Sequence, residues 1–391
     1  MSQLPPNSLF SLASAMSEAQ KPRGLGLGAT VLGAGAPPND SLGGLLRQAM
    51  TRAPRQQGLG LAATALGLGT PSSVASGLGS LLRQAAAPTP AWAPTWPFVT
   101  RRFTTFAENL ALTPLQVTDG ETKYKGVVKT LNQAYWGSDS ETDHAFYIGS
   151  WAKDTRIRPP RDVDLYFVLP IEVYNRLQNS GYVNKQSALL QEVKGKLLAS
   201  YPLSDIKGDG PVVLAGFWTF NVEIVPAFLY DAAERSYYVC DTKNGGSYKK
   251  TMPLHEVDAI TWADQRNNSN VRRLVRMLKC WQAYCSVSIK SFHLELLATD
   301  FLDQWNHRDK SFFYYDWMCR DFFAWMITKA NTYVFAPGTF EAMNIGDAWK
   351  SRAESAYNRA VKACDHEYYS REGDAGDEWQ KIFGTDIPKW V

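Results

Sequence analysis

Two aspartates, Asp162 and Asp164, stand at the start of the apolar run DVDLYFV, residues 162–168. In an extended strand, residues i and i+2 point to the same face, so both carboxylates face one way while Val163 and Leu165 face the core. Adjacent carboxylates repel each other and raise each other's pKa unless cations neutralise them. Hard divalent cations such as Mg²⁺ prefer oxygen ligands and leave coordination positions for substrate phosphates, so the pair predicts a metal site for phosphate chemistry.

The pair Gly149-Ser150 ends an apolar segment shortly before these aspartates and suggests a phosphate-binding turn. Glycine lets the backbone approach an anion closely, and backbone N–H groups at the start of a following helix bind phosphate. The Ser150 hydroxyl adds one more donor. Either motif occurs often by chance when alone, but the two together in a strand–turn–strand context indicate phosphoryl or nucleotidyl transfer.

The order of these motifs resembles the nucleotidyltransferase fold of the polymerase-beta superfamily. The resemblance implies a third carboxylate on a later strand, and Glu223 in the apolar run FWTFNVEIVPAF, residues 217–228, is the candidate. An ionised carboxylate inside such a run is costly unless it is paired, metal-bound or turned to solvent on an edge strand. The family more often has aspartate here, and glutamate adds one methylene to the expected third ligand.

Four further segments narrow the resemblance to the bacterial cGAS/DncV-like nucleotidyltransferases, which make cyclic oligonucleotide second messengers. Their spacing is more specific than the Gly-Ser and Asp-Val-Asp motifs, and the resemblance runs from about residue 100 to the C-terminus. The segments are NKQSALLQEVKGKLL (184–198), VRRLVRMLKCWQ (271–282), KSFHLELL (290–297) and EWQKIFG (378–384).

The resemblance implies a mechanism in which a hydroxyl of one nucleotide attacks the α-phosphate of another and pyrophosphate leaves. It implies two metal ions, Mg²⁺ or Mn²⁺, which stabilise the attacking and leaving oxygens. Asp162 and Asp164 would be ligands of both ions, and Glu223 would bind the ion near the attacking hydroxyl. Gly149 and Ser150 would hold the β- and γ-phosphates.

The second half of the chain is expected to supply cations for the leaving pyrophosphate, whose charge grows in the transition state. The resemblance places a triphosphate-binding lysine at Lys279 and a phosphate-binding serine at Ser291. Taken alone, Lys279 also fits a lysine that lays its stem along an apolar surface, and Ser291 also fits a helix N-cap. Lys153, shortly after Ser150, is a further candidate for phosphate contact, whereas we expect Glu295 to be structural.

Composition limits the class of substrate and partner. The net charge of +3 divides into +4 over residues 1–97 and −1 over residues 98–391. A protein that holds long nucleic acid usually presents a basic face, so this balance favours mononucleotide substrates, and we expect no long nucleic acid. The resemblance implies ribonucleoside triphosphates as these substrates, ATP among them. The five cysteines contain no C-x-x-C pair, and no secretory signal opens the chain, so we expect a reducing bacterial cytoplasm.

Residues 1–97 differ sharply in composition from the rest of the chain. They hold 13 of the 29 glycines and 11 of the 21 prolines, and only one of the 36 Phe and Tyr residues, so they cannot bury an ordinary core. GLGLGATVLGAG (24–35) returns as GLGLAATALGLG (58–69), and LLRQA occurs at 45–49 and 81–85. Two copies are too few for a solenoid. We therefore predict either a flexible arm with two docking elements for a protein or membrane surface, or a linker without a partner.

These observations together predict an α+β fold in three parts. Residues 1–97 form the low-complexity N-terminal arm, and residues 98–235 form a polymerase-beta-like nucleotidyltransferase lobe with a mixed sheet. Residues 236–391 form a C-terminal helical lobe, in which the aromatic segment 311–330 supplies core. Nucleotides are expected in the cleft between the two lobes.

The leading hypothesis is a synthase that joins ribonucleoside triphosphates into a cyclic di- or trinucleotide in bacterial antiphage (CBASS-type) signalling, where the diffusible product reaches a separate effector. One alternative is a linear oligoadenylate synthase or an RNA-tailing nucleotidyltransferase. A second alternative follows from the glutamate at position 223: a catalytically weak nucleotide-binding scaffold that acts through its N-terminal arm.

Overall fold

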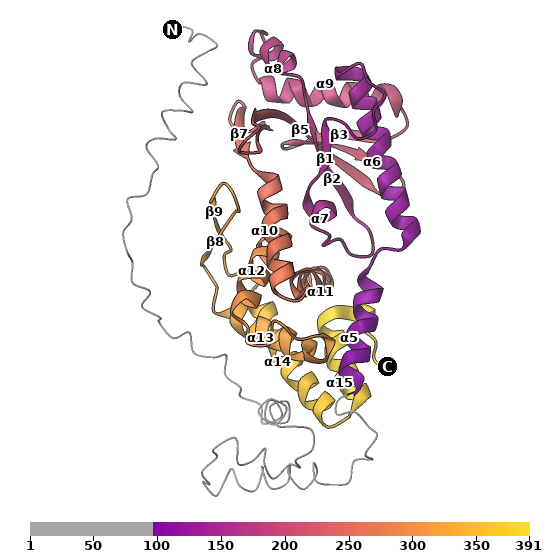
Figure 1. Cartoon of the computed structure of the whole chain (residues 1–391), viewed down its shortest axis with the longest axis vertical. Helices are drawn as coiled ribbons and strands as arrows, with labels where there is room; N and C mark the ends of the chain where they lie inside the picture. The colour runs from indigo at the N-terminus through magenta and orange to yellow at the C-terminus, as the bar shows by residue number, and fades with distance from the viewer. Residues whose placement is uncertain (1–96) are drawn as a thin grey trace, which may run out of the picture. The chain divides into compact units, whose positions relative to one another are not determined.

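The computed structural model describes residues 97–391, which form a lobe built on a mixed sheet and a helical lobe (Figure 1). The predicted arm, with its two repeats and its docking elements, lies outside the described residues except for Pro97.

The sheet lobe is built on seven strands. β1, β2, β5, β4 and β3 lie side by side in that order, with β6 beside β5 and β7 beside β6. β2 and β5 run parallel and the other neighbouring pairs run antiparallel, so the predicted mixed sheet is confirmed. The strands are β1 (Ala145–Tyr147), β2 (Asp162–Val168), β3 (Asp205–Asp209), β4 (Val212–Gly216), β5 (Asn221–Asp231), β6 (Ser236–Asp241) and β7 (Ser247–Thr251).

Helices α6 (Pro114–Tyr135) and α9 (Lys185–Ser200) bury one face of this sheet, and α8 (Ile171–Gln178) packs beside α9 (Figure 1). Val163 and Leu165 are fully buried in this layer, as the alternation of β2 predicts. The opposite face of β2 therefore carries the two aspartates. The short helix α7 (Gly149–Ala152) lies between β1 and β2.

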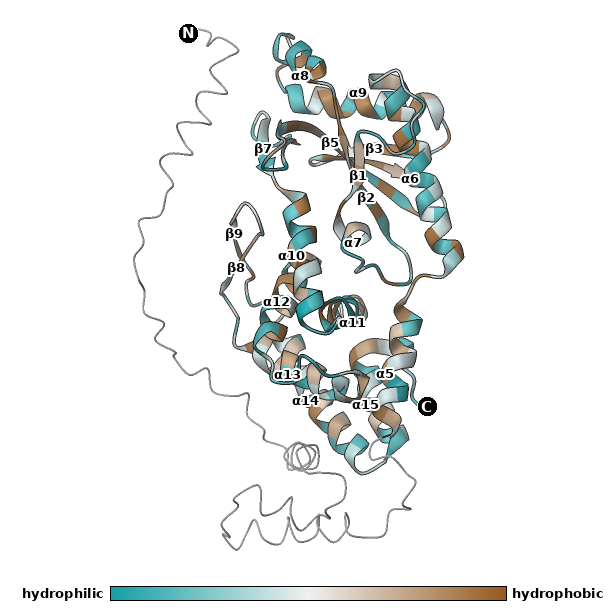
Figure 2. Cartoon of the chain, in the orientation of Figure 1, coloured by the Kyte–Doolittle hydropathy of each residue, from teal (hydrophilic) through white to brown (hydrophobic). Residues whose placement is uncertain are grey.

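The helical lobe packs around a second apolar core, and Figure 2 shows hydrophobic and hydrophilic residues along each of its helices. Such mixed helices bury one side against their neighbours. The aromatic segment 311–330 contributes buried residues such as Phe322 and Phe323, as expected. The elements are α5 (Pro97–Leu110), α10 (Pro253–Arg266), α11 (Asn270–Tyr284), α12 (Ser291–Gln304), η1 (Phe312–Tyr314), α13 (Tyr315–Ile327), β8 (Tyr333–Phe335), β9 (Ala342–Asn344), α14 (Lys350–Tyr368), α15 (Glu372–Phe383) and η2 (Gly384–Asp386).

Two groups of elements pack in the other lobe from the one expected from a division at residue 235. Helix α5 contributes Val99, Phe103 and Phe106 to the core of the helical lobe. The hairpin of β6 and β7 extends the sheet of the other lobe instead. Within residues 97–391, no helix combines the length and apolar character needed to cross a membrane.

Arg102 ties α5 to the C-terminal segment. Its side chain is fully buried, and its Nε atom donates to Glu367 Oε1 at 2.7 Å. The other nitrogens donate to backbone carbonyl oxygens of Pro388, of Lys389 at 2.7 Å and of Glu372 at 3.0 Å. A single guanidinium thus binds three segments at the end of the chain to its first described helix.

We expect Arg102→Met to lower the free energy of unfolding by about 3–5 kcal/mol, because the buried Glu367 carboxylate loses this ion pair. Urea unfolding followed by tryptophan fluorescence measures the change. Arg101→Met is the matched control, since Arg101 is exposed on the same helix turn, and it should change stability by less than about 0.5 kcal/mol. Equal effects of the two substitutions would contradict the assignment.

Candidate active site

The parallel pairing of β2 with β5 brings the three predicted carboxylates together. Asp164 lies directly opposite Glu223, and Asp162 lies opposite Asn221. Neighbouring strands are about 4.8 Å apart, so the two carboxylates of the first pair are immediate neighbours on one face of the sheet. Asn221 Nδ2 also donates to Asp162 Oδ1 at 3.0 Å, which orients that carboxylate.

Gly149 touches this acidic cluster. Its φ is +56°, and a Cβ atom added at Gly149 would lie 2.1 Å from Asp164 Oδ2. The Ile148 N–H group donates to the Asp164 carbonyl oxygen at 3.0 Å, which fixes β1 and the following turn against β2. Both the backbone conformation and the close approach therefore require glycine at position 149.

Burial, together with the negative charges of Glu223 and Asp162, raises the pKa of Asp164 to about 7. The positive charge of Lys279 and a hydrogen bond from the Ser150 backbone act in the opposite direction but do not restore the usual value. The carboxylate cluster therefore needs additional positive charge to be fully ionised at neutral pH.

A cavity of about 370 Å³ opens over the acidic face and is lined from both lobes. Seven of the eight predicted site residues line it, and Glu223 lies beside it through its pairing with Asp164. The seven are Gly149, Ser150, Lys153, Asp162, Asp164, Lys279 and Ser291.

Glu295 of α12 holds the two predicted phosphate-binding lysines. Lys153 Nζ lies 3.0 Å from Glu295 Oε2 and 2.7 Å from Glu256 Oε2, and it sits 4.3 Å from the centre of the Phe292 ring. Lys279 Nζ lies 2.9 Å from Glu295 Oε1. One carboxylate thus joins a lysine of the sheet lobe to a lysine of the helical lobe.

Opposing effects set the pKa values in this group. Burial alone would raise the pKa of Glu295, but the charges of Lys153 and Lys279 lower it overall. Burial tends to lower the pKa of Lys153, but Glu295 and Glu256 outweigh it and raise that pKa. Burial lowers the pKa of Lys279, and Glu295 offsets this only in part. The pairing therefore favours the ionised form of all three groups.

The sequence predicts a structural role for Glu295 and does not point to Glu256. The structure places both at the cavity wall. A signal for Glu295 was present, because it follows Ser291 by four residues and so shares one face of α12 with it. No local pattern marks Glu256, which reaches Lys153 only through the packing of the two lobes.

Ser291 lies at the cavity but is not a helix N-cap. Lys290 occupies the N-cap position and Ser291 is the first helical residue. The Ser291 hydroxyl donates to Gln282 Oε1 at 2.8 Å, so α11 orients it toward the site. Pairing with a side chain of the neighbouring helix replaces the backbone partner that a cap would use.

The donor types of the acidic cluster fit a hard divalent cation. Two aspartates and one glutamate meet on two paired strands. One of them, Asp164, has a raised pKa. Within residues 97–391, no three such side chains already converge on one point as a finished metal site. Side-chain rotation of the three carboxylates would therefore accompany metal binding.

Comparison with known proteins agrees with this geometry. Residues 98–267 match the model of the Second Messenger Oligonucleotide or Dinucleotide Synthetase (SMODS) domain. A probable cyclic nucleotide synthase of Bacillus cereus (strain VD146) is 24% identical over 275 residues, which are 61% of this chain and 81% of that protein. The chain is therefore similar to the cGAS/DncV-like nucleotidyltransferases. It is an enzyme of the cyclic nucleotide synthase class.

Solved structures of this family share the fold. CdnC of E. coli MS115-1, in a complex with HORMA-deltaN, matches with a TM-score of 0.55 and 19% identity over 74% of this chain and 98% of its own. The Vibrio cholerae di-nucleotide cyclase DncV matches with a TM-score of 0.53 and 11% identity over 81% of this chain and 92% of its own. These matches show the polymerase-beta-like nucleotidyltransferase fold that the sequence predicts.

The raised pKa of Asp164 predicts a pH-dependent effect on stability. The pKa of this group is about 7 in the folded protein and 3.8 ordinarily, so its contribution to stability is present at low pH and lost as pH rises through 7. In metal-free protein, Asp164→Asn should raise the free energy of unfolding by about 1–3 kcal/mol at pH 8 and by less at pH 5. Denaturant unfolding with EDTA at both pH values measures this. An equal gain at both would contradict it.

The contact between Gly149 and Asp164 predicts a steric effect on activity. Gly149→Ala should reduce nucleotidyl transfer by about 100-fold, because the new methyl group displaces the Asp164 carboxylate. Gly137→Ala is the matched control, since Gly137 has a φ of +65° and nothing within 4 Å of its added Cβ. The control should lose stability through backbone strain but keep activity. Full activity in Gly149→Ala, or an equal loss in both variants, would contradict a steric effect of the contact with Asp164.

Proposed function

We propose that this enzyme joins ribonucleoside triphosphates into a cyclic di- or trinucleotide with release of pyrophosphate. Asp162, Asp164 and Glu223 would hold two Mg²⁺ or Mn²⁺ ions. The observation that carries the proposal is the parallel register of β2 and β5, which sets Glu223 opposite Asp164 beside a cavity lined from both lobes.

Bound metal ions would stabilise the charge on the attacking and leaving oxygens. Asp162 and Asp164 would be shared ligands, because both project from the same face of β2. Glu223 would bind on the side of the attacking hydroxyl. A divalent cation at this position would also relieve the repulsion that raises the pKa of Asp164.

Phosphate binding would use both lobes. The backbone at Gly149 and Ser150 would hold the β- and γ-phosphates close to the carboxylates. Lys153 of the same lobe and Lys279 and Ser291 of the helical lobe line the same cavity and would also contact the triphosphate. Glu295 keeps the two lysines in place, so their positive charges are already gathered before nucleotide enters.

The substrates would include ATP, and the product would act on a separate effector in bacterial antiphage signalling of the CBASS type. Support comes from relatives solved with nucleotides: CdnC of E. coli MS115-1 with ATP and CdnG of Bradyrhizobium diazoefficiens with GTP. DncV of Vibrio cholerae is a cyclic AMP-GMP synthase solved with a linear intermediate. The proposed setting is the bacterial cytoplasm, with no long nucleic acid as partner and with the arm free to bind a protein or membrane surface.

Incubation with the four ribonucleoside triphosphates and Mg²⁺ or Mn²⁺ tests the proposal. Mass spectrometry after phosphatase treatment should find a resistant species with the mass of a cyclic di- or trinucleotide. Asp162→Ala with Asp164→Ala should reduce its formation by at least about 100-fold, because both shared ligands are lost. Asp205→Ala, at an exposed aspartate of β3, should leave it unchanged.

Other products would point elsewhere. A phosphatase-sensitive ladder would favour a linear oligoadenylate synthase or an RNA-tailing enzyme. Retained synthesis in the double variant would overturn the metal-ligand assignment. If the parent makes no product with either metal, Glu223→Asp tests whether the longer third ligand weakens the site.

A further inference from the structure

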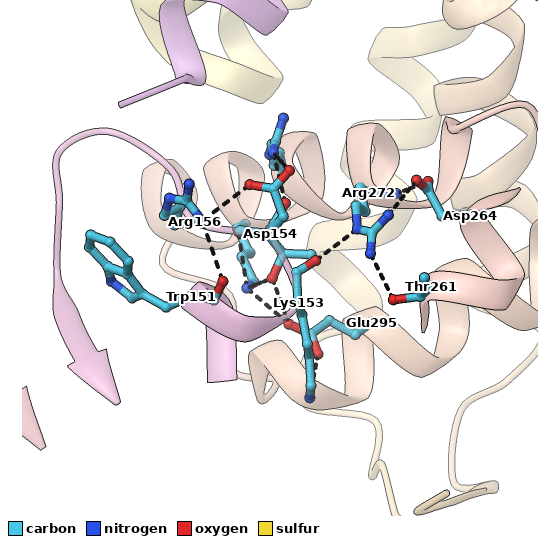
Figure 3. Close-up of polar contacts among 11 residues, drawn as sticks. Trp151, Lys153, Asp154, Arg156, Thr261, Asp264, Arg272 and Glu295 are labelled. Atoms are coloured by element: carbon cyan, nitrogen blue, oxygen red, sulfur yellow. Dashed lines mark hydrogen bonds and ion pairs between the residues drawn. The ribbon is translucent and has the colours of Figure 1, made fainter. Parts of the chain in front are cut away.

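Side chains of helix α11 donate hydrogen bonds to backbone carbonyl oxygens of the turn that follows α7. Arg272 Nε donates to the Lys153 carbonyl oxygen at 2.9 Å (Figure 3). Arg276 Nη2 donates to the Asp154 carbonyl oxygen at 2.7 Å. Lys279 Nζ donates to the Thr155 carbonyl oxygen at 3.2 Å. Three cationic side chains thus bind three successive carbonyl groups.

The spacing of the three donors explains how one helix can do this. Residues 272, 276 and 279 follow each other by four and three positions, so they form one stripe along α11. Arg272 is held in its orientation by Asp264 Oδ2 at 2.9 Å and by Thr261 Oγ1 at 2.9 Å, both on α10 (Figure 3). Arg272 is therefore fixed to α10 within the helical lobe.

The turn that α11 binds contains a backbone conformation that is unfavourable without stabilising contacts. Asp154 has a φ of +52°, in the left-handed region that residues with a Cβ atom rarely adopt. Its carboxylate pairs with Arg276 at 2.8 Å and with Arg156 at 3.2 Å. The Lys153 and Thr155 N–H groups donate back to the Gly149 and Ser150 carbonyl oxygens at 3.1 and 3.0 Å. The conformation at Asp154 is thus linked to the position of Gly149-Ser150.

Lys279 has no spare donor in this arrangement. Its three N–H bonds are matched by the Thr155 carbonyl oxygen, the Thr155 hydroxyl at 2.8 Å and Glu295 at 2.9 Å. A contact between Lys279 and phosphate requires the release of one of these partners. Arg272 and Arg276 would keep hold of the turn while Lys279 changes partner.

We propose that Arg272 and Arg276 are positioning residues for nucleotide binding. Through them, the helical lobe holds the turn of residues 149–155 so that Gly149 and Ser150 stay against Asp164 and face the cavity. The nature of the ligand, a nucleoside triphosphate, rests on the proposed function. The holding of the turn by Arg272 and Arg276 rests on the contacts described above.

Hydrogen exchange of the free enzyme, measured without substrate, tests whether α11 holds the turn of residues 149–155. Arg276→Met should speed exchange of the Lys153 and Thr155 amides by about tenfold, because the turn opens more often when its ion pair and its carbonyl donor are lost. Arg273→Met is the matched control on the same helix. Arg273 instead donates to the Tyr315 hydroxyl at 3.1 Å and stacks over Phe312, so its loss should leave these amides unchanged.

Binding of α,β-methylene ATP with Mg²⁺, measured by calorimetry, tests the consequence. Arg276→Met should weaken binding about tenfold and raise KM more than it lowers kcat, because the phosphate contacts are made in the ground state as well as in the transition state. Arg273→Met should bind like the parent, even if its melting temperature falls.

The outcomes separate the two proposals. Unchanged exchange in Arg276→Met would show that Arg276 does not hold the turn. Faster exchange with unchanged nucleotide binding would overturn the positioning role but leave the proposed function intact. A parent enzyme that binds no nucleotide would overturn the proposed function and the positioning role together, whatever the exchange result.

Discussion

The parallel pairing of β2 with β5 is the interaction on which the site depends. Because side chains alternate along a strand, a slip of one residue would turn Glu223 into the apolar layer and Val222 out of it. The buried face prevents that slip, since Val163, Leu165, Val222 and Ile224 are all fully buried there. The core on one face of the sheet thus determines which carboxylates meet on the other, and apolar packing is the physical reason for the acidic cluster.

Charge is distributed unequally across the cavity. On the side of the helical lobe, Glu295 and Glu256 neutralise Lys153 and Lys279, and such pairing makes burial of these ions tolerable. On the side of the sheet, the pKa of Asp164 is raised because burial and the neighbouring carboxylates outweigh Lys279. The cation of a metal-bound triphosphate would offset the excess negative charge at the carboxylates, while its phosphates could take over the lysines from Glu295 and Glu256. The lobes are joined across the same cavity by α11 and the turn after α7.

Much of the architecture follows from local patterns. Alternation in DVDLYFV predicts which face of β2 is buried, and the aromatic segment 311–330 predicts a helical core; both agree with the structure. The packing of α5 is different, because its amphipathic pattern says that one side is buried but not against which lobe. The same holds for β6 and β7, because their local sequence does not say which sheet they join.

The sequence by itself determined the types of group at the site and their local geometry. Asp162 and Asp164 must share a face of a strand, and a glycine must stand where the backbone turns beside them. Only the tertiary structure decided that Glu223 lies opposite Asp164 and that Glu295 binds Lys153 and Lys279. It also decided that side chains of α11 bind the backbone of residues 153–155. The reason is physical: backbone geometry dictates contacts within a strand or a helical turn, whereas contacts between distant segments depend on how their buried faces pack.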